Sequence, residues 1–125
     1  MNDNPQRSIT DVVHAYVRAL NGADLDAIMA LYAEDATVED PVGSPPKVGS
    51  AAIRAFYAAS TAMKLDVALE GEIRVTDRVC AFAFRVSLAH EGRTTTIRPI
   101  DVFEFDADGR IQRMRAYFGA PNIHH

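Results

Sequence analysis

The chain has 125 residues, of which 48% are hydrophobic and 24% are charged, and its formal net charge is -4. We expect one domain spanning residues 1–125, because a chain of this length buries about two thirds of its unfolded surface. Its basic residues form no cluster that would neutralise a phosphate backbone, which argues against nucleic acid as a partner. The N-terminus MNDNPQRSIT lacks the apolar core of a signal peptide, and no apolar run approaches the roughly 20 residues that span a bilayer. These features predict a cytoplasmic protein without membrane contact.

The N-terminal half predicts three helices. Ser8, with Asp11 three residues later, has the pattern of a capping box, and the first helix should end at the Asn-Gly pair 21–22. Asp24 is expected to cap a short second helix. Its predicted inner side carries Leu25, Ile28, Leu31 and Tyr32.

A short extended piece, ATVEDP (36–41), should follow the second helix, because Thr and Val favour strands and the residue before a proline avoids the helical region. The next residues, 43–49, are rich in Gly and Pro and predict a loop. Ser50 is expected to cap a third helix. The predicted inner side of that helix carries Ile53, Phe56, Tyr57 and Ser60.

From Lys64 the hydrophobic period changes from 3.6 to 2 residues, which indicates strands. Four strands are predicted, at residues 64–75, after the turn 76–78 as far as Ala89, at 94–105 and at 110–118. Three helices followed by an antiparallel meander predict α+β architecture, with a curved antiparallel sheet packed on the helices. A pocket is expected between the sheet and the helices.

One acidic residue of the third strand stands in an apolar row. Asp101 shares a face with Ile97, Pro99, Phe103 and Phe105, while the other face carries Thr94, Thr96, Arg98, Ile100, Val102 and Glu104. An ionised carboxylate is costly on a buried face unless it has a partner or stays protonated. Two alternatives remain open: the strand face is misassigned, or an arginine pairs with Asp101.

Other polar residues are ambiguous from the sequence. Tyr16, Tyr32 and Tyr57 are predicted on the inner sides of three helices, where each is either a core aromatic or a site residue. Asp40 precedes Pro41, so it is either part of a solvated turn or a carboxylate held in place.

The single cysteine, Cys80, is expected in the core. The four histidines, His14, His90, His124 and His125, have no spacing that would place three around one ion, so no metal is expected.

Four segments together resemble the bacterial Δ5-3-ketosteroid isomerases, which have the cone-shaped, nuclear-transport-factor-like (cystatin-like) fold. They are YVRALNGADLDAIMALYAEDATVEDPVGS, AAIRAFYA, RPIDVFEFDADGRI and MRAYFG, and they cover almost the whole chain. The resemblance implies Asp40 as general base, with Tyr16 and Asp101 as hydrogen-bond donors to an oxyanion. A tyrosine and a protonated aspartate are the known oxyanion donors of ketosteroid isomerases. Tyr57 and Tyr32 then form a supporting network behind Tyr16.

The implied function is conversion of 3-oxo-Δ5-steroids to 3-oxo-Δ4-steroids without a cofactor. The implied assembly is a homodimer that uses the outer sheet face around Arg98 and Ile100. Some relatives carry an indole near the base, whereas this chain has no tryptophan and offers Phe118. The expected substrate-binding residues are Leu20, Phe56, Phe84, Pro99, Phe103, Met114, Ala116 and Phe118.

Two other functions fit the same fold. One is a non-catalytic binder of steroids or other apolar ligands, and the other is a cyclase or epoxide hydrolase. The presence of Tyr16, Asp40 and Asp101 favours the isomerase, because a carrier has no use for a free base facing its ligand.

Overall fold

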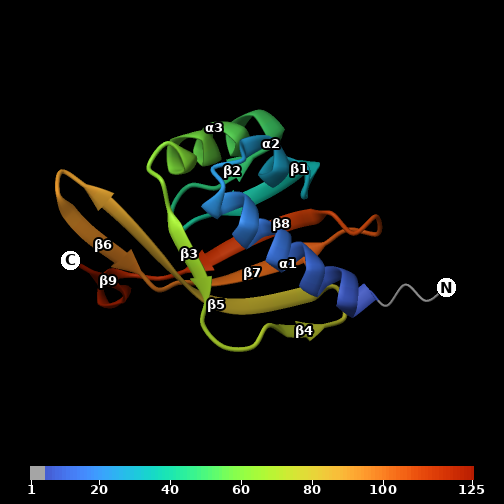
Figure 1. Cartoon of the computed structure of the whole chain (residues 1–125). Coiled ribbons are helices and arrows are strands. Elements are labelled where there is room, and N and C mark those ends of the chain that lie inside the picture. The colour runs from blue at the N-terminus through green and yellow to red at the C-terminus, as the bar shows by residue number, and fades with distance from the viewer. Residues whose placement is uncertain (1–4) are drawn as a thin grey trace.

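The computed structural model describes residues 5–125, with side chains from Ser8 onward, and has the predicted α+β architecture (Figure 1). The helices are α1 (Pro5–Asn21), α2 (Leu25–Met29) and α3 (Ser50–Thr61). The strands are β1 (Tyr32–Glu39), β2 (Lys47–Val48), β3 (Asp66–Leu69), β4 (Arg74–Thr76), β5 (Val79–His90), β6 (Arg93–Ile97), β7 (Ile100–Phe105), β8 (Ile111–Tyr117) and β9 (Ile123–His124). A short 3-10 helix, Ala120–Asn122, precedes β9.

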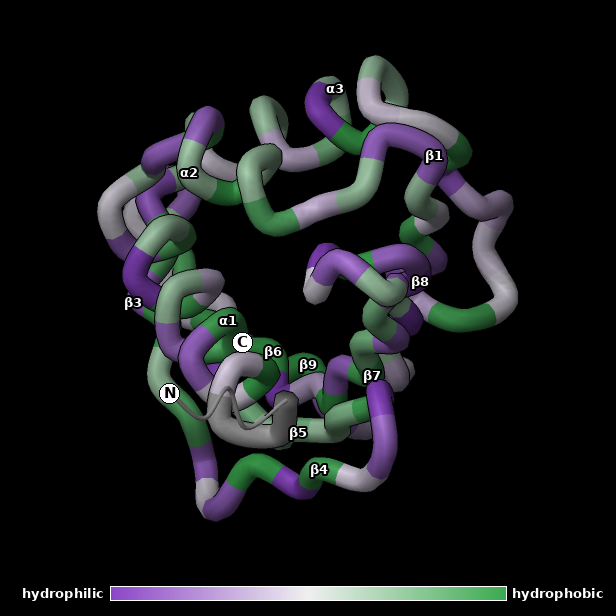
Figure 2. Tube along the Cα trace, turned by 90° about the vertical axis from the view of Figure 1, so that its right-hand side faces the viewer, coloured by the Kyte–Doolittle hydropathy of each residue, from purple (hydrophilic) through white to green (hydrophobic). Residues whose placement is uncertain are grey.

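The sheet curls around the interior of the molecule, and the helices close the open side of the curve (Figure 2). Its strand order is β2-β1-β8-β7-β5-β6-β9, with β3 and β4 also paired to β5. The long β5 pairs with β7 through its first half, Val79–Ala83, and with β6 through its second half, Val86–His90. The long β5 therefore belongs to both halves of the sheet.

The sheet is mixed, because β1 pairs with β8 in parallel, with Val38 opposite Met114. The predicted meander is present as antiparallel pairs of β5 with β3, β4, β6 and β7, and of β7 with β8. A parallel pair joins segments far apart in the chain, so the local alternation of residues did not reveal it.

The boundaries of the helices differ from the predicted ones. Helix α1 begins at Pro5, three residues before the predicted capping box at Ser8, since a proline is well suited to the first helical position. Gly49, not Ser50, occupies the N-cap position of α3. Helix α2 ends at Met29, and Tyr32 is the first residue of β1 rather than part of a helix.

Two predicted strands are each divided in the structure. Residues 70–73 separate β3 from β4, and Gly71 has the positive φ of 93° that glycine tolerates best. Arg98 and Pro99 separate β6 from β7, as expected for a proline, which has no N–H for the ladder. Near the C-terminus, His124 belongs to β9 and pairs opposite Thr96 of β6.

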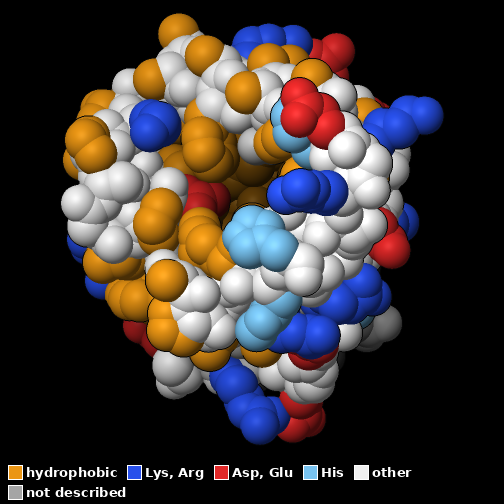
Figure 3. Space-filling view, turned by 90° about the vertical axis from the view of Figure 1, so that its left-hand side faces the viewer, with side chains coloured by type: hydrophobic (Ala, Val, Ile, Leu, Met, Phe, Trp, Pro, Cys, Tyr) orange, Lys and Arg blue, Asp and Glu red, His pale blue; other side chains and the backbone are white. Residues whose placement is uncertain are grey.

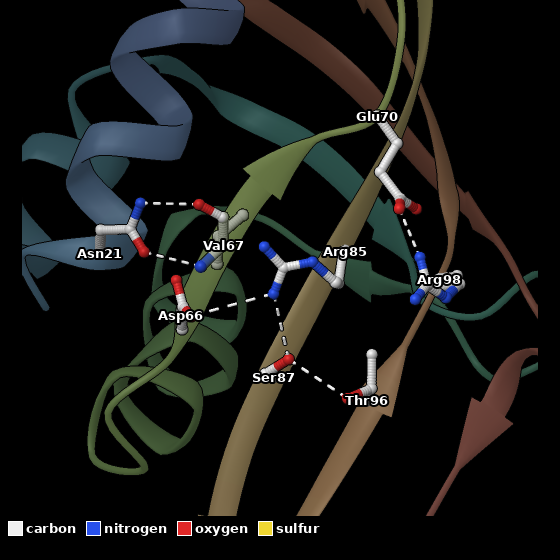
Figure 4. A network of polar contacts seen from close by, with 8 residues as sticks. All are labelled: Asn21, Asp66, Val67, Glu70, Arg85, Ser87, Thr96 and Arg98. Carbon is white, nitrogen blue, oxygen red and sulfur yellow. Dashed lines mark hydrogen bonds and ion pairs between the residues drawn. The ribbon is translucent and has the colours of Figure 1, made fainter.

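Helix α1 and the sheet are joined by polar contacts along β3 (Figure 4). The carboxamide of Asn21 donates to the Val67 carbonyl at 2.9 Å and accepts from the Val67 N–H at 2.7 Å. It thereby replaces a strand partner at this edge. Arg98, between β6 and β7, pairs with Glu70, which follows β3. The hydrogen bonds of Asn21 thus hold the end of α1 against β3, and the ion pair joins two segments of the sheet.

The core fills the space between the helices and the inner face of the sheet. Cys80 is fully buried there, as predicted, and burial raises the pKa of its thiol to about 12. No helix in the described part of the chain is long and apolar enough to span a bilayer. No group of three or more potential metal ligands occurs among residues that the structure describes.

Candidate active site

A cavity of about 190 Å³ lies between α1, α3 and the inner face of the sheet. A space-filling view shows a hollow bordered mostly by hydrophobic side chains, with an acidic group visible inside it (Figure 3). Most of the lining is apolar, which suits a hydrophobic ligand with few polar groups. The lining residues are Tyr16, Leu20, Asp40, Phe56, Tyr57, Ser60, Met63, Leu65, Phe84, Val86, Leu88, Ile97, Pro99, Asp101, Ala116 and Phe118.

Three tyrosines from different elements form a hydrogen-bonded chain at the cavity. The Tyr16 hydroxyl of α1 lies 2.9 Å from the Tyr57 hydroxyl of α3, which lies 2.6 Å from the Tyr32 hydroxyl of β1. All three side chains are buried, and burial raises each pKa well above the usual value. They are therefore neutral donors at neutral pH. Tyr16 and Tyr57 reach the cavity, while Tyr32 lies behind them.

Asp101 is the buried acidic residue of the site, as its place in an apolar row predicted. It lies on β7, its side chain is 1% exposed, and neither carboxyl oxygen has a hydrogen-bond partner among the described residues. Burial raises its pKa well above the usual value, and the nearby Asp40 raises it further. No described arginine pairs with Asp101, so the alternative of an arginine partner is wrong. The raised pKa favours the neutral form of Asp101, in which the carboxyl group can donate a hydrogen bond.

Asp40 follows the end of β1 and is half-buried at the same cavity. The bond between Asp40 and Pro41 is cis. Burial raises the pKa of Asp40 to about 6, and Lys47 acts in the opposite direction. The adjacent Glu39 instead accepts a hydrogen bond from the Gly43 N–H at 3.1 Å. Asp40 is therefore ionised at neutral pH but remains basic enough to take a proton.

The structure places most of the expected substrate-binding residues at the cavity. Six of the eight expected substrate-binding residues line the cavity: Leu20, Phe56, Phe84, Pro99, Ala116 and Phe118. Phe103 and Met114 do not, because they are cross-strand partners that lie fully buried behind the cavity wall. Phe103 instead packs edge-on against Tyr16, with ring centroids 5.1 Å apart. It supports a site residue rather than a ligand.

Sequence reasoning missed part of the cavity wall. The missed lining residues are Ser60, Met63, Leu65, Val86, Leu88 and Ile97. Two of them carried a signal, since Ser60 was on the predicted inner side of the third helix and Ile97 on the face of Asp101. The others come from two segments distant in the chain, the link between α3 and β3 (Met63 and Leu65) and the second half of β5 (Val86 and Leu88).

The site combines one half-buried carboxylate with two neutral donors, Tyr16 and Asp101. Lysine and arginine are absent from its lining among the described residues. A base with a pKa near neutrality can remove a weakly acidic proton, and neutral donors can stabilise the resulting oxyanion without pairing with the base. The geometry therefore suits proton abstraction next to a carbonyl in an apolar ligand.

Comparisons with known proteins find a family and several enzymes similar to this chain. Residues 13–114 match the SnoaL-like domain family. The chain is 43% identical over 106 residues to the steroid Delta-isomerase of Nocardioides simplex, covering 85% of each chain. It is 27% identical over 128 residues to the epoxide hydrolase LasB of Streptomyces lasalocidi, where the match covers 87% of this chain and 40% of that protein.

A solved structure gives the same fold. It is that of the epoxide hydrolase/cyclase-like enzyme SalBIII, described for pyran ring formation in the polyether salinomycin. Its TM-score is 0.88 at 27% sequence identity, over 94% of this chain and 95% of that one. The chain therefore belongs to the steroid Delta-isomerase family, within the SnoaL-like and nuclear-transport-factor-like superfamily.

Proposed function

We propose that this protein is a steroid Δ-isomerase that converts 3-oxo-Δ5-steroids to 3-oxo-Δ4-steroids. One observation carries the proposal: a half-buried carboxylate, Asp40, shares an apolar cavity with two protonated donors, Tyr16 and Asp101. The direction of each pKa shift supports the role that we propose for the group. The similarity to the Nocardioides enzyme supports the same reaction.

In the proposed mechanism, Asp40 removes a proton from the carbon between the ketone and the double bond. The C–H electron pair forms a dienolate, and negative charge develops on the C3 oxygen. Tyr16 and Asp101 donate hydrogen bonds to that oxygen, which lowers the barrier because the donors are already in place. Asp40 then returns the proton to C6, so the double bond moves into conjugation and no cofactor is consumed.

Tyr57 and Tyr32 act through Tyr16. The Tyr57 hydroxyl bonds to both other hydroxyls, so it can donate to Tyr16 while Tyr16 donates to the oxyanion. A chain of hydrogen bonds polarises each member and strengthens the terminal donor. We assign these two residues a supporting role.

The apolar lining would hold the steroid rings. Leu20, Phe56 and Phe118 contribute from helices and the end of the sheet, and Phe84 and Pro99 contribute from the sheet wall. A rigid polycyclic ligand pays little conformational entropy on entering such a slot.

The epoxide hydrolase or cyclase is the second candidate, because two similar proteins carry those names. An epoxide hydrolase needs polar groups that orient a water molecule. Apart from the proposed catalytic residues and Tyr57, Ser60 supplies the single other hydroxyl of the lining, and it already donates to the Phe56 carbonyl at 3.3 Å. This lining supports the isomerase better.

The deciding experiment mixes purified protein with a Δ5-3-ketosteroid and follows the ultraviolet absorbance of the conjugated enone. We expect the absorbance to rise much faster than in buffer alone, and we expect Asp40→Asn to lose this enzyme-dependent rise. A parallel sample with a hydrophobic epoxide is analysed for diol. Diol formation without enone formation would replace the isomerase by the hydrolase, and ligand binding without either product would indicate a carrier.

A further inference from the structure

Lys47 lies on the strand paired with the end of β1, which precedes the proposed base Asp40, and sequence reasoning gave it no role. It occupies β2 directly opposite Val38 of β1 in an antiparallel pair. Directly opposite residues of such a pair project from the same face of the sheet. Val38 is 1% exposed and faces the core, so the first part of the half-buried Lys47 side chain also points toward the interior. Asp40 lies two residues after Val38, at the end of the same strand.

The ammonium group of Lys47 is held at the edge of the cavity. Its Nζ atom lies 5.7 Å from the centroid of the Phe56 ring, within the range of a cation–π contact. Phe56 and Asp40 both line the cavity. The same Nζ atom approaches the Pro45 carbonyl at 3.5 Å, a long contact that leaves most of its donor capacity free. The Lys47 side chain thus packs near Phe56, and its ammonium group has no strong hydrogen-bond partner among the described residues.

The ionisable groups that face Asp40 from inside the molecule carry no positive charge. Tyr16 of α1, Tyr32 of β1 and Tyr57 of α3 are neutral, because burial raises their pKa values. Asp101 of β7 is an acid, and a second negative charge there would oppose ionisation of Asp40. None of these groups supplies a positive charge that would stabilise the ionised form of Asp40.

Charged groups on the neighbouring strands are engaged elsewhere. Glu39 accepts a hydrogen bond from the Gly43 N–H. Arg113 and Arg115 of β8 both pair with Glu104 of β7. Among the described residues, Lys47 therefore remains as a cation near the end of β1 whose charge is free to act on Asp40, and it lowers the pKa of that carboxyl group.

We propose that Lys47 is a positioning residue for the reaction: its ammonium group keeps the Asp40 carboxylate ionised, and so extends the activity of the enzyme to lower pH. A cation near a carboxylate favours the charged form, and the effect is larger when both groups are partly removed from water. The role of Asp40 as base rests on the proposed function, whereas the electrostatic coupling to Lys47 does not.

Removal of the charge should move the acidic limb of the pH profile. Without Lys47, Asp40 binds its proton more tightly, so a smaller fraction of the enzyme is active below the pKa of Asp40. In Lys47→Gln we expect kcat/KM on the acidic limb to fall by about threefold, with no loss on the alkaline plateau. Lys47→Arg should restore the original profile.

Two control variants separate charge from packing and from surface potential. Lys47→Met keeps an apolar stem over Phe56 and should give the same profile as Lys47→Gln. Arg54→Gln removes a cation of α3 that pairs with the exposed Asp26, and it should leave the profile unchanged. A uniform loss at every pH in Lys47→Gln, or an unshifted profile in Lys47→Met, would overturn the proposal in favour of a packing role.

A second measurement is independent of catalysis. The carboxyl carbon of Asp40 is titrated by NMR in the unliganded protein, in the wild type and in Lys47→Gln. We expect the midpoint to rise in the variant, and an unchanged midpoint overturns the coupling even if the enzyme isomerises steroids. A raised midpoint in a protein without isomerase activity would instead retain the coupling and reject the proposed function.

Discussion

The Tyr32 and Tyr57 hydroxyls lie 2.6 Å apart, so Tyr57 bridges a residue of β1 and the Tyr16 hydroxyl of α1. Tyr57→Phe breaks both hydrogen bonds and leaves two buried hydroxyls without this partner. We expect Tyr57→Phe to lower the free energy of unfolding by about 1–3 kcal/mol, measured by urea denaturation. Its kcat should fall less than that of Tyr16→Phe, because Tyr57 acts through Tyr16. If Tyr57→Phe impairs kcat as strongly as Tyr16→Phe, Tyr57 contacts the substrate itself.

Tyr16→Phe removes a proposed oxyanion donor while keeping the ring that packs against Phe103. We expect kcat to fall about 10²–10³-fold with little change in KM, because the hydrogen bond strengthens as negative charge develops. Steady-state kinetics with the enone assay measure both constants. Equal losses in ligand affinity and in kcat would show that Tyr16 binds the ground state instead.

Asp40→Asn should lower kcat at least about 10²-fold and leave steroid binding intact, because it removes the base and keeps the shape. In the wild type, kcat/KM should fall as pH drops through about 6, where Asp40 becomes protonated. A variant with full activity would transfer the role of base to another group, with Glu39 the first to test.

The same substitution should affect stability in a pH-dependent way. The pKa of Asp40 is raised in the folded protein from its usual value of 3.8, so the folded state binds this proton more tightly than the unfolded state. The resulting stability is present at low pH and is lost as pH rises through about 6. Asp40→Asn has no ionisable group at this position, so the variant does not lose this stability as pH rises. Its melting temperature relative to wild type should therefore be higher at roughly pH 8 than at roughly pH 4.

Asp101 can stabilise an oxyanion only as a neutral acid, since an ionised carboxylate would repel it. Asp101→Asn keeps a neutral donor and should retain much more activity than Asp101→Leu, which should lose about 10²–10³-fold in kcat. Binding of a phenolic steroid that mimics the dienolate should weaken in the same order. Equal losses in both variants, or an ionised Asp101 detected by infrared spectroscopy at neutral pH, would reject the role.

Asp101→Leu should also raise the melting temperature. The two Asp101 oxygens are buried without a hydrogen-bond partner among the described residues, so an apolar side chain of similar size removes a desolvation cost. A gain in stability with a loss of activity is expected of a residue retained for function.

The outer face of the sheet carries the proposed dimer interface. Ile100 and Tyr117 are cross-strand partners there and are 46% and 42% exposed. Ile100→Asp should weaken a homodimer by about tenfold or more in Kd, measured by sedimentation equilibrium. Val48→Asp is the control, because Val48 is 66% exposed on β2, which β1 and β8 separate from the β7 strand of Ile100. A monomeric wild type at micromolar concentration would reject the dimer.

The sequence by itself determined the elements whose pattern is local. The 3.6-residue spacing of α1 and α3 and the alternation along β5, β7 and β8 each place side chains on one face, whatever the rest of the chain does. Asp101 was found in this way, because its neighbours two residues away are apolar. Resemblance to the ketosteroid isomerases supplied the proposed roles of Tyr16 and Asp40, and local patterns did not.

Only the tertiary structure decided features that depend on distant segments. The parallel pairing of β1 with β8 places Tyr32 in a strand, although its local sequence continues a helical pattern. Burial behind the cavity wall removes Phe103 and Met114 from the cavity, and the pairing of β2 with β1 places Lys47 opposite Val38, two residues before Asp40. Such contacts depend on which surfaces meet after the chain has folded, and the periodicity of one segment contains no information about its partner.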